Sequence, residues 1–134
     1  MQRVVLDTNV IVSGILSEHG PPGWIVDLVA AAELALVYDV RILNEYRDVL
    51  TRSRLKLNTT RVQFLLDIIS ANGIPVTPMP WQVPLPDPDD EPFLACAKMA
   101  SAPLVTGNLR HYPEQSRFAV TVLTPRQFLD KLRA

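Results

Sequence analysis

Histidine and cysteine are scarce in this chain. Its 134 residues include two histidines, His19 and His111, and one cysteine, Cys96. A single cysteine excludes an internal disulfide framework. Because Cys96 lies between alanines in an apolar stretch, we expect it to be a buried packing thiol. With no His/Cys cluster at ligand spacing, a zinc site is disfavoured.

Long apolar runs and a strong charge of one sign are also absent. No stretch approaches the roughly 18 apolar residues of a membrane span. Asp7 interrupts the N-terminal region where a signal peptide needs its apolar core, so we expect a cytoplasmic protein without membrane contact. The formal net charge of −1 does not favour a generally basic nucleic-acid binder. Nucleic-acid binding would therefore need local charge or a bound metal.

Several catalytic signatures are missing too. The chain has no glycine-rich phosphate loop, no nucleophile elbow and no Cys/His pair. Its length and 48% hydrophobic content suit a single domain over residues 1–134, and we find no internal repeat.

Short apolar runs alternate with helical patterns along the chain. This alternation predicts an α/β three-layer sandwich, with a central mostly parallel sheet flanked by helices. Proline-rich residues 78–88 predict an extended connection. The predicted strands cover residues 4–6, 34–37, 74–76, 104–106 and 120–123, and the predicted helices cover residues 10–16, 24–32, 40–53, 59–72, 93–100 and 125–132.

Polar residues stand where two predicted strands end. Asp7 directly follows the first strand, and Asn108 closely follows the strand at 104–106. Sites of parallel sheets form at the carboxyl ends of the strands. Asp7 could instead cap the next helix, but Thr8 or Asn9 could also serve as that cap.

A third candidate lies on the predicted helix at 40–53. Glu45 falls at the edge of its apolar stripe, beside Ile42 and Val49, so it can face a cleft. The alternative is a solvated glutamate paired with Arg41 one turn away.

An acidic run precedes the predicted helix at 93–100. Capping and the helix dipole account for one or two such acids, but this run has Asp87, Asp89, Asp90 and Glu91. Together with Asp7 and Glu45, they predict a carboxylate site for one or two ions of Mg²⁺ or Mn²⁺. Such an ion would lower the pKa of a water and offset charge at phosphorus.

Three other residues could contact a nucleic-acid substrate. Arg110, next to Asn108, could bind a phosphate, and His111 could approach the same cleft. Trp81 could stack on a base, although a packing contact is the simpler interpretation.

Four segments resemble, in order, the motifs of PIN-domain proteins. Residues 4–10 (Val-Val-Leu-Asp-Thr-Asn-Val) resemble the opening motif, and Glu45 resembles the second acid. Residues 90–97 resemble the third motif with Asp90 as its aspartate, and residues 104–108 resemble the last motif.

The resemblance implies a Mg²⁺- or Mn²⁺-dependent ribonuclease. Many bacterial members are toxins neutralised by an antitoxin, as in VapBC-type pairs, so the resemblance also implies an RNA substrate, an antitoxin partner and a homodimer. Asp7, Glu45 and Asp90 would be the catalytic metal ligands. Thr8, Asn9 and Thr106 would orient ligands or water, and Asp87 and Asp89 would add outer negative charge.

The last motif departs from the family pattern. Asn108 and His111 stand where a further acid is common, and an amide supplies no charge. We therefore expect weaker metal binding or a single ion.

Two other functions remain open. A degenerate PIN-like module that binds RNA or protein without nuclease activity is favoured by Asn108. A phosphatase with Asp7 as nucleophile is disfavoured, because Asn9 stands where a second carboxylate is needed.

Overall fold

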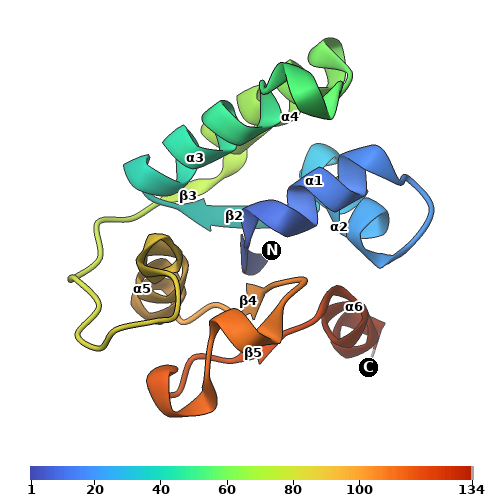
Figure 1. Ribbon diagram of the computed structural model, residues 1–134. Coiled ribbons are helices and arrows are strands. Elements are labelled where there is room, and N and C mark those ends of the chain that lie inside the picture. Colours follow the sequence, from blue (N-terminus) through green and yellow to red (C-terminus); the bar gives the residue numbers. More distant parts are fainter. Residues whose placement is uncertain (134) are drawn as a thin grey trace.

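Five parallel strands form one sheet in the order β3-β2-β1-β4-β5 (Figure 1). The computed structural model describes residues 1–133, so the last residue of the predicted domain, Ala134, lies outside the described part. The strands are β1 (Gln2–Leu6), β2 (Leu34–Tyr38), β3 (Ile74–Pro75), β4 (Leu104–Val105) and β5 (Val122–Leu123). The predicted mostly parallel sheet is confirmed.

Helices flank this sheet, as predicted. Every residue of β2 is buried, although successive side chains of a strand point to opposite faces, so both faces of the sheet are covered. The helices are α1 (Thr8–Leu16), α2 (Pro21–Ala30), α3 (Val40–Leu50), α4 (Thr59–Asn72), α5 (Glu91–Ala100) and α6 (Pro125–Arg133).

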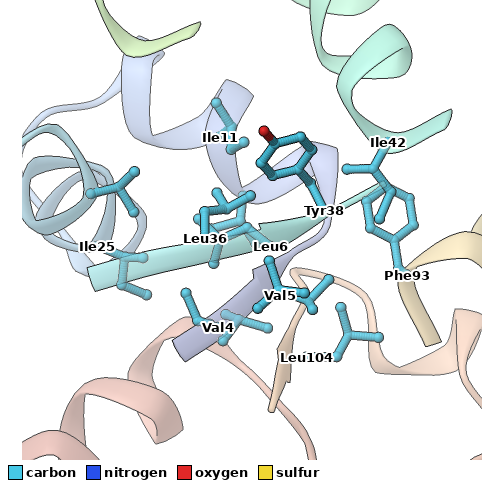
Figure 2. Packing of buried hydrophobic residues seen from close by; sticks show 14 of the residues in the cluster. Val4, Val5, Leu6, Ile11, Ile25, Leu36, Tyr38, Ile42, Phe93 and Leu104 are labelled. Atoms are coloured by element: carbon cyan, nitrogen blue, oxygen red, sulfur yellow. The ribbon is translucent and has the colours of Figure 1, made fainter. Parts of the chain in front are cut away.

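The hydrophobic core forms around the two central strands. Val4, Val5 and Leu6 of β1 are buried, and Figure 2 shows them between the helices and the neighbouring strands. On one side Leu6 and Leu36 face Ile11 of α1, together with residues of α2 and α4. This close packing fixes the position of the carboxyl end of β1. Asp7 follows directly after that end.

Three helices begin earlier than predicted. The prediction placed the first helix at residue 10, but Asp7 occupies the N-cap position and the helix begins at Thr8. The second helix begins at Pro21 rather than residue 24, because a proline in the first turn loses no hydrogen bond. The helix expected from residue 93 likewise begins at Glu91.

Two predicted helix ends were too far along the chain. The second helix stops at Ala30, because Ala32 takes a left-handed conformation with φ 58°. The third helix stops at Leu50 instead of residue 53, and a 3₁₀ turn, η1 (Ser53–Leu55), follows it.

Three strands, β3, β4 and β5, are shorter than predicted. The strand expected at 120–123 covers only Val122–Leu123, because Phe118 and Ala119 form a left-handed turn before it, with φ 46° and 71°. Neither Thr106 nor Val76 belongs to a strand.

The proline-rich connection is irregular up to residue 87, as expected. Trp81 packs edge-on against Phe118, with ring centroids 5.8 Å apart, and its indole N–H donates to the Ser116 carbonyl at 3.2 Å. These contacts favour the packing interpretation of Trp81 over base stacking.

Two expectations from composition can be compared with the structure. Cys96 is fully buried, and burial, followed by the charge of Asp39, raises the pKa of its thiol to about 12, as a packing thiol requires. Within residues 1–133, no helix has both the length and the apolar character needed to cross a bilayer.

Candidate active site

The three acids expected to form the site meet at the carboxyl edge of the sheet. Asp7 follows β1, Glu45 lies on α3, and Asp90 ends η2 (Pro88–Asp90), directly before α5. Asp7 and Asp90 are only 5% and 7% exposed. Burial, followed by the charge of Asp7, raises the pKa of Asp90 to about 7, with Glu45 adding to the effect. The three carboxylates therefore share one electrostatic environment.

The Asp7 carboxylate is held by two hydroxyl groups. Its Oδ2 accepts a hydrogen bond from Thr106 Oγ1 at 2.9 Å and another from Tyr112 Oη at 2.9 Å. Although Asp7 occupies the N-cap position of α1, its side chain makes no capping hydrogen bond. Among residues 1–133 no hydrogen bond uses Asp7 Oδ1, so this oxygen is free for another ligand.

Glu45 points toward α1 and does not pair with Arg41. Thr8 Oγ1 donates a short hydrogen bond to Glu45 Oε2. Arg41 instead forms an ion pair with Asp39, the residue that caps α3, at 2.6 Å. Burial, partly offset by the Thr8 hydrogen bond, and then the charge of Asp7 raise the pKa of Glu45.

Glu45 also borders a cleft, as its helical position predicted. The cleft has a volume of about 340 Å³ and lies between α3 and the start of α5. Its walls combine apolar and charged groups, contributed by Arg41, Ile42, Glu45, Pro88, Asp89, Glu91, Pro92 and Phe93.

The Asp90 carboxylate lies next to the partly exposed His111, and one of its oxygens accepts no hydrogen bond. Its Oδ2 is fully buried and accepts no hydrogen bond from residues 1–133. His111 Nδ1 lies 3.0 Å from this oxygen, which gives an ion pair when the imidazole is protonated. A buried carboxylate oxygen that accepts no hydrogen bond is costly, so a cation beside it would stabilise the site.

In the rest of the acidic run, Asp87 and Asp89 are exposed and Glu91 is half-buried. Asp87 Oδ1 accepts a hydrogen bond from the Asp89 N–H at 3.0 Å, so Asp87 caps η2. Asp89 is exposed and contributes to the raised pKa of Glu45. Capping thus explains Asp87. Asp90 occupies the N-cap position of α5, but its side chain makes no capping hydrogen bond.

The last motif forms a network around Asp7. Asn9 Oδ1 accepts a hydrogen bond from the Gly107 N–H at 2.9 Å. Asn108 N–H donates to Thr106 Oγ1 at 3.1 Å, while Asn108 Oδ1 accepts from the Arg110 N–H at 3.2 Å and caps η3 (Leu109–His111). The Asn108 side chain therefore supports a turn, and Arg110 is exposed on that turn.

Two buried tyrosines lie near the site, and the contact of Tyr112 with one of its acids was not anticipated. Tyr112 binds Asp7, and Tyr46 Oη donates to the Leu6 carbonyl at 2.5 Å. In the sequence each tyrosine resembles an ordinary core residue. The one available signal was general: a buried tyrosine hydroxyl needs a partner.

The donor atoms of this site suit a hard cation. Carboxylate oxygens are the ligands that Mg²⁺ and Mn²⁺ favour, and the mutual repulsion of Asp7, Glu45 and Asp90 falls when a cation lies among them. Within residues 1–133, however, no three His, Cys, Asp or Glu side chains are already arranged as a metal-ligand cluster.

The PIN domain family matches residues 3–110, so the chain belongs to the PIN-domain family. PIN domains are generally nucleases. An uncharacterised protein of Methanocaldococcus jannaschii is 27% identical over 140 residues, covering 96% of this chain and 90% of that protein.

Two solved structures share the fold. One is VapBC2 from Rickettsia felis bound to a fragment of its promoter DNA, with a TM-score of 0.59, 16% identity, and coverage of 92% of this chain and 98% of the other. The second is FitAcB from Neisseria gonorrhoeae, with a TM-score of 0.54, 20% identity, and coverage of 92% and 98%. At this identity the likeness concerns the fold.

Proposed function

We propose that this protein is a metal-dependent endoribonuclease and the toxin of a toxin–antitoxin pair. The observation that carries the proposal is the buried Oδ2 of Asp90, which accepts no hydrogen bond and lies beside the charges of Asp7 and Glu45. A cluster of largely buried acids at the carboxyl edge of a parallel sheet favours a bound cation. Membership of the PIN-domain family supports nuclease chemistry there.

The metal ligands would be Asp7, Glu45 and Asp90. A bound Mg²⁺ or Mn²⁺ supplies a water of lowered pKa and positive charge for the reacting phosphodiester. The chain itself contributes orientation: Thr106 and Tyr112 hold Asp7, and Thr8 holds Glu45. The fixed carboxylates avoid the cost of ordering the site during each reaction.

We propose that the substrate of this nuclease is RNA. Arg110 is exposed on the turn after Asn108, in a position to contact a phosphate of the bound strand. Asp87 and Asp89 are both exposed and lie near Glu45. Their negative charge attracts a cation to the site and repels a phosphate when no cation is bound.

We also propose a protein partner for this chain. VapBC2 and FitAcB share the fold of this chain, and VapBC2 is bound to promoter DNA. By analogy we propose an antitoxin that binds this chain, and a homodimer of the chain within the complex. Co-purification with the product of an adjacent short reading frame tests the antitoxin, and light scattering of the pure chain tests the dimer.

RNA cleavage by the purified protein tests the activity. We expect cleavage of a single-stranded RNA with Mn²⁺ or Mg²⁺ and none with EDTA. Asp7→Asn and Asp90→Asn should each reduce cleavage by about 100-fold or more, because each removes a charged ligand of the cation.

A matched control is Asp67→Asn, an exposed acid on α4 far along the chain from the site acids. It should cleave RNA at the wild-type rate. Cleavage that persists in EDTA, or that survives both active-site substitutions, contradicts the proposal.

Two observations favour a second function, a PIN-like module that binds RNA or protein without cleaving it. Asn108 supports a turn and supplies no fourth carboxylate, and residues 1–133 hold no preformed metal-ligand cluster. Mn²⁺ titration separates the two functions: a folded protein that binds RNA but no Mn²⁺ at millimolar concentration is the binding module.

A further inference from the structure

We infer that Tyr112 is a positioning residue: its hydroxyl, with that of Thr106, fixes the Asp7 carboxylate so that Oδ1 remains available to a metal ion. The inference rests on the proposed nuclease function and deepens it. It assigns a role to a residue outside the motifs of the opening strand, the acidic run and the last strand.

The hydrogen bonds themselves define the role. Both hydroxyls donate to the same oxygen, Asp7 Oδ2, at 2.9 Å each. Tyr112 and Thr106 are fully buried and Asp7 is 5% exposed, so water does not readily replace either donor. Hydrogen bonds from neutral donors to a charged acceptor are stronger than neutral pairs. Two of them on one oxygen restrict the rotation of the carboxylate.

The segment that carries Tyr112 also reaches a second acid. His111, its neighbour in sequence, places Nδ1 3.0 Å from Asp90 Oδ2. The same segment is shaped by Asn108, whose Oδ1 accepts from the Arg110 N–H. Asn108 thus acts indirectly: it supports the turn η3, and the residues at the end of this turn contact the carboxylates.

The chemistry of Tyr112 suits a permanent donor. Burial, followed by the charge of Asp7, raises the pKa of Tyr112 well above its ordinary value, so the phenol keeps its proton. A phenylalanine would occupy the same space without the hydroxyl. Tyr112→Phe therefore removes the hydrogen bond to Asp7 with little change in packing.

Another tyrosine provides a matched control. Tyr46 is also fully buried and also donates one hydrogen bond, but its acceptor is the Leu6 carbonyl. Tyr46→Phe therefore removes a buried hydroxyl of the same kind without touching a carboxylate. Thr106→Val is the companion variant, because it removes the second donor to Asp7 Oδ2.

The experiment measures Mn²⁺ binding to the full chain by calorimetry and electron paramagnetic resonance, with RNA cleavage alongside. We expect Tyr112→Phe to raise the Mn²⁺ Kd about 10-fold or more, as is typical when a partner of a ligand is lost. Thr106→Val should also raise the Mn²⁺ Kd. Tyr46→Phe should lower the Tm while leaving the Mn²⁺ Kd within about 2-fold of wild type.

The outcomes separate this inference from the proposed function. Wild-type protein that binds no Mn²⁺ and cleaves no RNA overturns both. If the wild type binds Mn²⁺ and cleaves RNA, but Tyr112→Phe leaves the Kd unchanged, only the positioning role is wrong. Equal losses of Mn²⁺ affinity in Tyr112→Phe and Tyr46→Phe also overturn it. If Tyr112→Phe does not fold, an unchanged Mn²⁺ Kd in Thr106→Val overturns the positioning role instead.

Discussion

The side chain of Asn9 accepts a hydrogen bond from the backbone N–H of Gly107 at 2.9 Å, across a separation of 98 residues. Asn9 lies in the first turn of α1, and Gly107 follows β4 directly after Thr106. The bond joins the segments on either side of Asp7. It holds Thr106 in place as a donor to the Asp7 carboxylate.

Asn9→Ala should therefore affect activity more than stability. Gly107 is exposed, so water can replace the lost acceptor, and we expect a loss of about 1 kcal/mol in the free energy of unfolding. RNA cleavage should fall by about 10-fold, because the Thr106 segment becomes less well positioned. Urea denaturation and an RNA cleavage assay measure the two effects. Asn44→Ala, at an exposed position of α3, should leave both almost unchanged.

Thr8 offers a test of how Glu45 is held. Thr8→Val removes the hydroxyl that donates to Glu45 Oε2 but keeps the side-chain volume. We expect cleavage to fall by about 10- to 100-fold, as for other partners of ligands. Thr8→Ser retains the hydroxyl and should recover most of the activity. Equal activity in the valine and serine variants would show that the hydroxyl does not matter.

Gly73, at the end of α4, tolerates no side chain. A Cβ there would lie 2.4 Å from the Ile69 carbonyl oxygen and 2.8 Å from that of Leu36. Because backbone atoms cannot easily move away, Gly73→Ala should lower the free energy of unfolding by about 2–3 kcal/mol. Gly107→Ala is the milder comparison, since its Cβ would meet the Asn9 side chain at 3.2 Å. Thermal unfolding should rank Gly73→Ala as clearly less stable.

Metal-free protein should lose stability as the pH rises from about 4 to about 7. The pKa of Asp90 is raised from 3.8 to about 7 in the folded protein, by burial first and then by Asp7, with Asp87 and Glu45 adding to it and His111 opposing it. In this window folded Asp90 keeps a proton that the unfolded chain releases, so the free energy of unfolding falls with rising pH. The raised pKa of Glu45 acts in the same direction.

Thermal unfolding in EDTA measures this dependence. The Tm of the wild type should be several degrees higher at pH 5 than at pH 7.5, and the Asp90→Asn variant should lose most of this difference. An unchanged pH profile in Asp90→Asn would mean that Asp90 titrates near its ordinary pKa.

Local rules in the sequence predicted the fold and indicated Asp7 and Glu45 as candidate site acids, whereas Asp90 was selected from the acidic run by its resemblance to the PIN-domain motif. Asp7 stood out because an acid directly after a buried strand needs a partner, and Glu45 because of its angle on the helix. The parallel sheet followed from the alternation of strands and helices. Each of these signals is contained in a short stretch of consecutive residues, so it can be identified from one sequence.

The parts that sequence reasoning missed depend on contacts between distant segments. Tyr112 reaches Asp7 across 105 residues, and no local pattern marks a tyrosine as the partner of an acid. The start of α1 was misplaced because Asp7 takes the N-cap position while its carboxylate binds elsewhere. Asn108 was interpreted as the replacement for a ligand, whereas its amide caps η3, an arrangement that depends on where the following turn lies.

The order of the strands also bears on synthesis. β1 lies at the centre of the sheet, between the early β2 and the late β4, and Asp7 at its end depends on Thr106 and Tyr112. A ribosome making this protein releases the first acid long before the hydroxyls that hold it. A growing chain would therefore carry an unfinished site until residue 112 has left the exit tunnel. The proposed nuclease would become able to act on RNA only after the segment that carries Thr106 and Tyr112 has been made.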